Sequence, residues 1–371
     1  MHSISVADLH NLTVQIWIIG FVLSLAVGVL IHRGHFCTMG AISDWVVMQD
    51  ATRLRQWALA LAVAMMGFGT MALLGWIDPA NTIYAAKHLS WLSGLFGGAL
   101  FGVGMVLASG CSSKTLVRLG AGNLKSLVVL LAMAVAALAT MKGLTAVWRV
   151  NFIDPIGVHL SHGPFMGQWL SAMTGLSLSN AWGLSAGLVA LILLVWVTKG
   201  RGFNTLFNWV TGAGLGLLVV AFWWLSGIFG FVPEHPETLE PFFLTTHSGR
   251  MEALSFTAPV GYWLDALLYY SDGSKRLTLG MVTVLGVLSG ACISSILQGS
   301  FRWESFTQRS DLLRHLVGGS LMGAGGVLAM GCTFGQGLTG LSTLSLGSAV
   351  SVTGIFVGAY TALQWQMRKS Q

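Results

Sequence analysis

Long uninterrupted runs of apolar residues constrain the fold of this chain more than any other feature. The run from residue 14 to 31 contains no charged side chain, and several later runs are of similar length. A helix needs about 20 mostly apolar residues to cross a bilayer. Only 9% of the residues are charged, against roughly 25% in soluble domains. The runs do not alternate as in a β-barrel, so we expect an all-α integral membrane protein.

The apolar runs predict about nine transmembrane helices within a single transmembrane transport domain, residues 1–371. The expected spans are 14–31, 57–76, 91–110, 127–141, 183–198, 206–230, 277–298, 315–331 and 344–365. The short stretch 253–270 contains Pro259, Gly261 and Asp265, and we expect it to enter the membrane and return as a re-entrant helix. Segment 142–182, with several tryptophans, is expected to lie at the membrane interface.

The positions of Lys and Arg predict the orientation. The first 31 residues contain neither, whereas Arg53 and Arg55 follow the first span. Positive residues concentrate in cytoplasmic loops. The N-terminus is therefore expected outside, and the C-terminus, with Arg368 and Lys369, inside. The net charge of +6 reflects this bias, and we expect no nucleic-acid partner.

An internal repeat is the strongest signal in the chain. Residues 97–111 read GGALFGVGMVLASGC and residues 318–332 read GGSLMGAGGVLAMGC, with ten of fifteen positions identical at an offset of 221. If 253–270 does not cross, the two copies run in opposite directions. We predict an inverted internal repeat with halves at approximately 14–141 and 253–365. Inverted repeats recur in transporters, where interrupted helices meet at a midplane site; a packing duplication is the alternative.

Cysteines end both copies of the repeat. Cys111 follows Gly110 and Cys332 follows Gly331. A glycine permits a helix break, which frees backbone amides that bind anions. A thiol there can donate a weak S–H hydrogen bond or exchange with a sulfur-bearing ligand. We expect both thiols to be functional, and Cys292 to be a packing residue.

Positive residues without acidic neighbours accompany these thiols. Arg33 precedes Cys37, and Lys114 and Arg118 follow Cys111. This pattern indicates an anionic substrate, although ordinary cytoplasmic anchoring is the alternative for the arginines. Asp265 is a lesser candidate for proton coupling.

Enzyme signatures and cofactor motifs are not found. The sequence has no HExxH, GxSxG or P-loop motif, and its cysteine spacing fits neither a zinc site nor a CxxC redox pair. We expect no enzyme activity, metal or cofactor. The alternative is an intramembrane thiol–disulfide or quinone-linked oxidoreductase, which needs two cysteines with Cα atoms within about 7 Å.

The cysteine motifs resemble those of the YeeE/YedE family of bacterial inner-membrane sulfur transporters. The resemblance rests on His32–Cys37 followed by Gly40, on Gly110–Cys111 with Arg118, and on Gly331–Leu338, which includes Gln336. It implies a multi-pass permease in which Cys37, Cys111 and Cys332 line the substrate path. The family usually has Gln and Arg at positions 32 and 35, and Gly at position 114.

The resemblance implies uptake of an inorganic sulfur anion, with thiosulfate as the leading candidate, from periplasm to cytoplasm. Some family members are tied to selenium, so a selenium-related permease is a second alternative. The resemblance also implies a small TusA-like sulfur-carrier protein as a partner, beside membrane lipid. The predicted path residues are Cys37, Cys111, Cys332, Arg33, Gly110, Gly331, Lys114, Arg118 and Gln336.

Overall fold

Nine long helices form the body of the described structure. The computed structural model describes residues 6–200, 202–234, 240–273 and 276–370. The long helices are α1 (Val6–Gly34), α3 (Thr52–Leu73), α4 (Trp91–Leu107), α6 (Leu124–Lys142), α9 (Leu178–Thr198), α10 (Leu206–Trp224), α12 (Leu279–Leu297), α13 (Arg309–Leu328) and α14 (Leu346–Ser370). All except α13 overlap with eight segments that are long and apolar enough to cross a membrane. The predicted all-α membrane fold is confirmed.

Helix α13 is the one long helix of the described chain outside these eight segments, and it begins with charged residues. It has twenty residues, and Arg309, Asp311 and Arg314 lie in its first two turns. The rest of the helix is rich in glycine and packs between α4 and α6. Each of the nine apolar runs predicted from the sequence therefore corresponds to one long helix.

Short elements connect the long helices. The short α-helices are α2 (Thr38–Ser43), α5 (Ser112–Gly120), α7 (Leu144–Trp148), α8 (Met166–Thr174) and α11 (Thr257–Leu268). The π- and 3₁₀-helical turns are η1 (Asp44–Met48), η2 (Pro79–Asn81), η3 (Arg149–Ile153), η4 (Leu225–Phe229) and η5 (Gly335–Gly340). Two antiparallel pairs of two-residue strands complete the list: β1 (His88–Leu89) with β2 (Val158–His159), and β3 (Phe231–Val232) with β4 (Phe242–Phe243).

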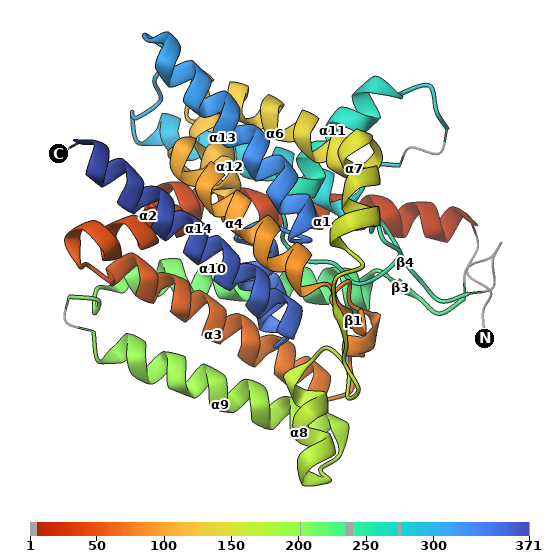
Figure 1. Cartoon of the computed structure of the whole chain (residues 1–371). Helices are drawn as coiled ribbons and strands as arrows, with labels where there is room; N and C mark the ends of the chain where they lie inside the picture. The colour runs from red at the N-terminus through yellow and green to blue at the C-terminus, as the bar shows by residue number, and fades with distance from the viewer. Residues whose placement is uncertain (1–5, 201, 235–239, 274–275, 371) are drawn as a thin grey trace.

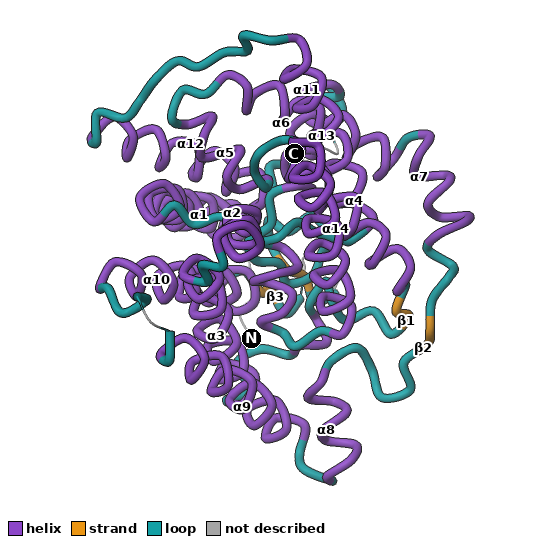
Figure 2. The backbone as a smooth tube through the Cα atoms, turned by 60° about the vertical axis from the view of Figure 1, so that its left-hand side comes forward, coloured by secondary structure: helices purple, strands orange, loops and turns teal. Residues whose placement is uncertain are grey.

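The long helices lie side by side, and the start of α1 and the end of α14 are at opposite ends of the bundle (Figure 1). We call the end that contains α2 and the end of α14 the basic end, because Arg53, Arg302 and Lys369 lie there. The opposite end contains α7 and the β1–β2 pair. Figure 2 shows α8 and α9 at one edge of the molecule, with α9 beside α3.

Helices α4 and α13, which contain the two repeat segments, cross each other antiparallel. A methyl group added to Gly97, near the start of α4, would meet Leu328 at the end of α13. One added to Gly104, near the end of α4, would meet the backbone of Gly318. The two copies of the repeat therefore run in opposite directions.

Equivalent glycines of the two copies pack against equivalent neighbours. Gly102 of α4 lies against the backbone of Ile355 in α14, and Gly323 of α13 lies against the backbone of Met133 in α6. The two glycines are separated by the repeat offset of 221 residues. Small residues allow such close helix contacts in membranes. These glycines thus serve close packing of the long helices.

Helix α11 enters between other helices without changing the direction of the chain. It has twelve residues, about 18 Å at 1.5 Å per residue, and this is shorter than a bilayer core of about 30 Å. Helix α1 runs antiparallel to α10, as Gly34 contacts Thr211, and parallel to α12, as Gly28 contacts Val287 and Gly20 contacts Leu279. Because α10 and α12 run in opposite directions, α11 between them is not a crossing, in agreement with the predicted re-entrant segment.

Candidate functional site

Helix breaks place three cysteines in the interior. Cys37 is the residue before α2, Cys111 is the residue before α5, and Cys332 lies between α13 and η5. Each is buried, with exposed fractions of 7%, 0% and 0%. The cause is local, since each cysteine follows a helix end and precedes a short helical element.

The two breaks that end the repeat segments have the same backbone conformation. Ser109 after α4 and Met330 after α13 both have φ of 56°. The N–H of Gly110 donates to Met105 O (2.9 Å), and the N–H of Gly331 donates to Gly326 O (2.8 Å). Gly110 and Gly331 thus lie at equivalent helix ends, where each places the next residue, a cysteine, beyond the break.

Cys37 and Cys111 form a pair of adjacent thiols. Their sulfur atoms are 3.9 Å apart. Cys111 Sγ also lies 3.2 Å from the Ser113 hydroxyl, and Cys37 Sγ accepts a hydrogen bond from the Gly40 N–H (3.4 Å). The first and second cysteine motifs are therefore brought together.

The third motif packs against the other two. Cys332 Sγ accepts a hydrogen bond from the Gly335 N–H (3.5 Å). The next residue, Thr333, lies beside the Cys111 thiol. The ring of Phe334 packs edge-on against Phe36, with centroids 5.8 Å apart. All three cysteine motifs consequently meet in one region of the interior.

The predicted basic residues are not equivalent in the structure. Lys114 lies in the first turn of α5, half-buried, close enough to interact electrostatically with Cys37 and Cys111. Within the described chain its ammonium group has no hydrogen bond and no carboxylate partner. Arg118 donates to Ser109 O (2.6 Å) and so braces the turn after α4. Arg33 is exposed rather than buried with the cysteines.

Gln336 connects the cysteine region to a cavity at the end opposite the basic end. Its Nε2 donates to Ala329 O (2.6 Å), whereas its Oε1 has no partner. The cavity has a volume of about 410 Å³ and lies between the start of α4, the end of α13 and the start of α14. Tyr84 also lines it, and the Tyr84 hydroxyl donates to Gly335 O.

A second cavity, of about 300 Å³ and lined mainly by polar side chains, occupies the equivalent place at the basic end. It lies at the end of α4 and the start of α6, where Ala108 and Ser126 line it. The corresponding residues of the second repeat, Ala329 and Ser348, line the larger cavity. A cavity therefore lies beside the break after α4 at the basic end, and another lies beside the break after α13 at the opposite end.

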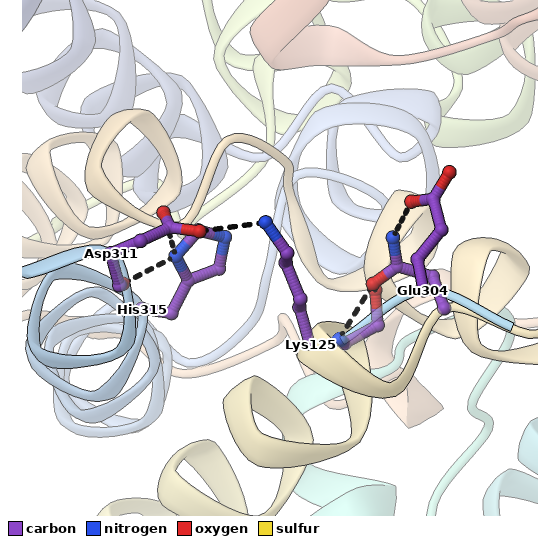
Figure 3. Close-up of polar contacts among 6 residues, drawn as sticks. Lys125, Glu304, Asp311 and His315 are labelled. Atoms are coloured by element: carbon purple, nitrogen blue, oxygen red, sulfur yellow. Dashed lines mark hydrogen bonds and ion pairs between the residues drawn. The ribbon is translucent and has the colours of Figure 1, made fainter. Parts of the chain in front are cut away.

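An ion-pair network lines the smaller cavity (Figure 3). Lys125 Nζ lies 2.7 Å from Asp311 Oδ2, and His315 Nδ1 lies 3.1 Å from Asp311 Oδ1. Nearby, the Asn123 amide donates to Glu304 Oε2 (2.5 Å). The lysine here is paired with a carboxylate, unlike Lys114.

Other candidates from the sequence lie apart from the thiols. Cys292 is in α12, where its backbone packs against Gly120, which agrees with a packing role. Asp265 is buried and ion-paired with Lys142 (2.8 Å), so it stabilises the contact between α6 and α11. Within the described residues, no group of three or more His, Cys, Asp or Glu side chains could hold a metal ion.

Hydroxyl groups beside the cysteines were missed by the sequence analysis. Thr38, Ser112 and Thr333 directly follow Cys37, Cys111 and Cys332, and their hydroxyl oxygens are buried without a hydrogen-bond partner. The signal in the sequence is a Cys-Ser/Thr pair that occurs three times. Only the structure shows that these hydroxyls are unpartnered.

Comparisons with known proteins agree with the cysteine motifs. The sulphur transport family matches residues 33–361. The thiosulfate transporter TsuA of Spirochaeta thermophila is 28% identical over 354 residues, covering 94% of this chain and 98% of the relative. The thiosulfate transporter TsuA of Escherichia coli is 26% identical over 365 residues, covering 92% of each chain.

Proposed function

The chain belongs to the sulphur transport family, and on this premise we propose that it takes up thiosulfate from the periplasm into the cytoplasm. The family is one of transporters rather than enzymes, and the chain is a multi-pass membrane protein. Both relatives described above are named for thiosulfate transport, and they align with this chain over nearly its whole length.

The observation that carries the proposal is the meeting of Cys37, Cys111 and the Cys332–Thr333 segment between two cavities. Thiosulfate is a dianion with a soft terminal sulfur. The larger cavity is the proposed entry, and Gln336 leads from it toward the cysteines. Arg118 lies at the smaller cavity, which is the proposed exit.

Each group has a distinct part in the proposed path. The thiols donate weak S–H hydrogen bonds to the terminal sulfur of the ion, and Lys114 supplies the opposing charge in the interior. Binding at each position stays weak because a conducting path must also release its ion. Gly110 and Gly331 set the breaks that place the thiols, whereas exposed Arg33 attracts anions near the basic end.

The orientation and the repeat complete the proposal. The basic end faces the cytoplasm of a bacterial cell and the opposite end faces the periplasm, as the positive-inside tendency predicts. The halves 14–141 and 253–365 are copies of one unit, a view supported by the antiparallel crossing of α4 and α13. A small TusA-like carrier that accepts the sulfur species at the basic end is the proposed partner.

Thiosulfate-dependent growth tests the proposal. The protein is expressed in a cysteine auxotroph that lacks its own thiosulfate uptake, with Cys111→Ala, Cys332→Ala and Cys292→Ala as variants. Wild type and Cys292→Ala are expected to restore growth on thiosulfate, and the other two variants are expected to fail. A wild type that does not restore growth contradicts thiosulfate uptake, and full rescue by Cys111→Ala and Cys332→Ala contradicts the proposed path.

A further inference from the structure

Seven serine or threonine hydroxyls in the described chain are buried without a hydrogen-bond partner. Three of them belong to Thr38, Ser112 and Thr333, each the residue after a cysteine of the proposed path. The fourth cysteine, Cys292, is followed by Ile293. The pairing of a thiol with an unpartnered hydroxyl is thus confined to the three cysteines that lie together.

The position of each hydroxyl at the start of a helical segment explains why it has no partner. Within a helix, a threonine hydroxyl usually donates to a carbonyl one turn earlier, as Thr115 does to Cys111 O (2.9 Å) and Thr283 to Gly280 O (2.6 Å). Thr38 and Ser112 are the first residues of α2 and α5. No helical turn precedes them, so this backbone acceptor is missing.

An unpartnered buried hydroxyl is unfavourable unless something else accepts its proton. Three such groups, each on the residue that follows a cysteine of the proposed path, are therefore expected to have an acceptor that is present only when the site is occupied. A hydroxyl donates to an atom with a free lone pair, and the oxygen atoms of an oxyanion supply such acceptors. The hydroxyls supply hydrogen bonds without the strong attraction of a full positive charge, which suits transient binding.

We propose that Thr38, Ser112 and Thr333 bind the oxygen atoms of the transported oxyanion while the neighbouring thiols contact its terminal sulfur. This inference rests on the proposed function and adds to it the groups that recognise the sulfonate end. The Thr333 hydroxyl lies beside the Cys111 thiol, so one ion can contact both kinds of donor.

Space for side-chain movement adjoins two of these residues. Thr38 and Thr333 both border a cavity of about 80 Å³ that Trp57 and Phe356 also line. The walls of this cavity are apolar, so we assign the ion to the thiol side and not to the cavity. The cavity leaves room for each threonine to change rotamer as the ion passes.

Uptake of radiolabelled thiosulfate by proteoliposomes tests this assignment. Thr333→Val and Ser112→Ala each remove one hydroxyl, and each is expected to raise KM about tenfold, the effect of losing one hydrogen bond to a charged group. Thr333→Ser keeps the hydroxyl and is expected to retain a KM near that of the wild type. Thr283→Val is the matched control, because its buried hydroxyl already donates to its own helix.

The outcomes separate this inference from the proposed function. If the wild type transports thiosulfate while Thr333→Val and Ser112→Ala keep its KM, the hydroxyls are not ligands although the function stands. If the wild type does not transport thiosulfate, the function itself fails. Equal losses in Thr333→Val and Thr333→Ser also overturn the assignment, because they indicate a packing role. Should Thr333→Val not fold, Ser112→Ala, which removes a single oxygen atom, decides the test.

Discussion

The sulfur atoms of Cys37 and Cys111 lie 3.9 Å apart in the interior, although the two residues are 74 positions apart in the sequence. All four cysteines are free thiols. The contact joins the break after α1 to the break after α4. Because these two cysteines are not separated, their positions do not exclude a thiol–disulfide enzyme, and the assignment to transport rests on the family match.

Mild oxidation is expected to cross-link Cys37 to Cys111 and to stop thiosulfate uptake. A disulfide would occupy both thiols and close the contact through which the ion passes. Mass spectrometry of the digested protein detects the linked peptides, and dithiothreitol is expected to restore transport. Cys111→Ser should lose the link and Cys292→Ser should keep it. If the folded wild type forms no disulfide, the sulfur atoms of Cys37 and Cys111 do not come close enough to bond.

Replacing Lys114 by Met is expected to raise KM for thiosulfate about tenfold, because the ion loses a positive charge that acts on both thiols. The comparison variant is Lys125→Met. Lys125 is already paired with Asp311, so its loss is expected to lower stability more than affinity. Uptake kinetics and thermal unfolding of both variants separate the two effects. Identical KM values for Lys114→Met and the wild type would exclude Lys114 from the path.

Gly102→Val is expected to destabilise the protein by about 1–3 kcal/mol, as overpacking does in a close-packed interior. The added side chain would overlap the backbone of Ile355 and Ala359 in α14. Gly187 in α9 is the control, since no atom lies within 4 Å of an added methyl group there. Gly187→Ala should be neutral or slightly stabilising. Thermal unfolding in detergent measures both, and equal melting temperatures would contradict the close contact of α4 and α14.

Glu252 makes stability depend on pH, and Glu252→Gln is expected to reduce this dependence. Burial raises the pKa of Glu252 above its usual value of 4.5, against hydrogen bonds from Ser248 that act the other way. The folded state then binds this proton more tightly than the unfolded state, so stability falls as pH rises from about 4.5 through the folded-state pKa. Melting curves across this range compare the wild type with the variant. If the stability of Glu252→Gln falls more steeply with pH than that of the wild type, the pKa of Glu252 is not raised in the folded state.

The cysteine motifs show how far the sequence could predict the site. Cys111 and Cys332 end two nearly identical segments, so their importance was visible in the repeat. The hydroxyls of Thr38, Ser112 and Thr333 were equally visible as letters. The sequence did not show that these hydroxyls lack hydrogen-bond partners, because the hydrogen bonding of a buried hydroxyl depends on the helix in which it lies.

By itself, the sequence determined the class of fold, the nine long helices, the repeat and the residues that end it, because apolar length and local identity do not depend on tertiary contacts. The tertiary structure decided which basic residue accompanies the thiols. Lys114 lies within electrostatic reach of Cys37 and Cys111, while Arg33 is exposed and Arg118 braces a turn. It also brought Cys37 within 3.9 Å of Cys111. Both results depend on how the helices pack. Packing brings together residues that are far apart in the sequence, and the sequence separation of two residues does not reveal their distance in space.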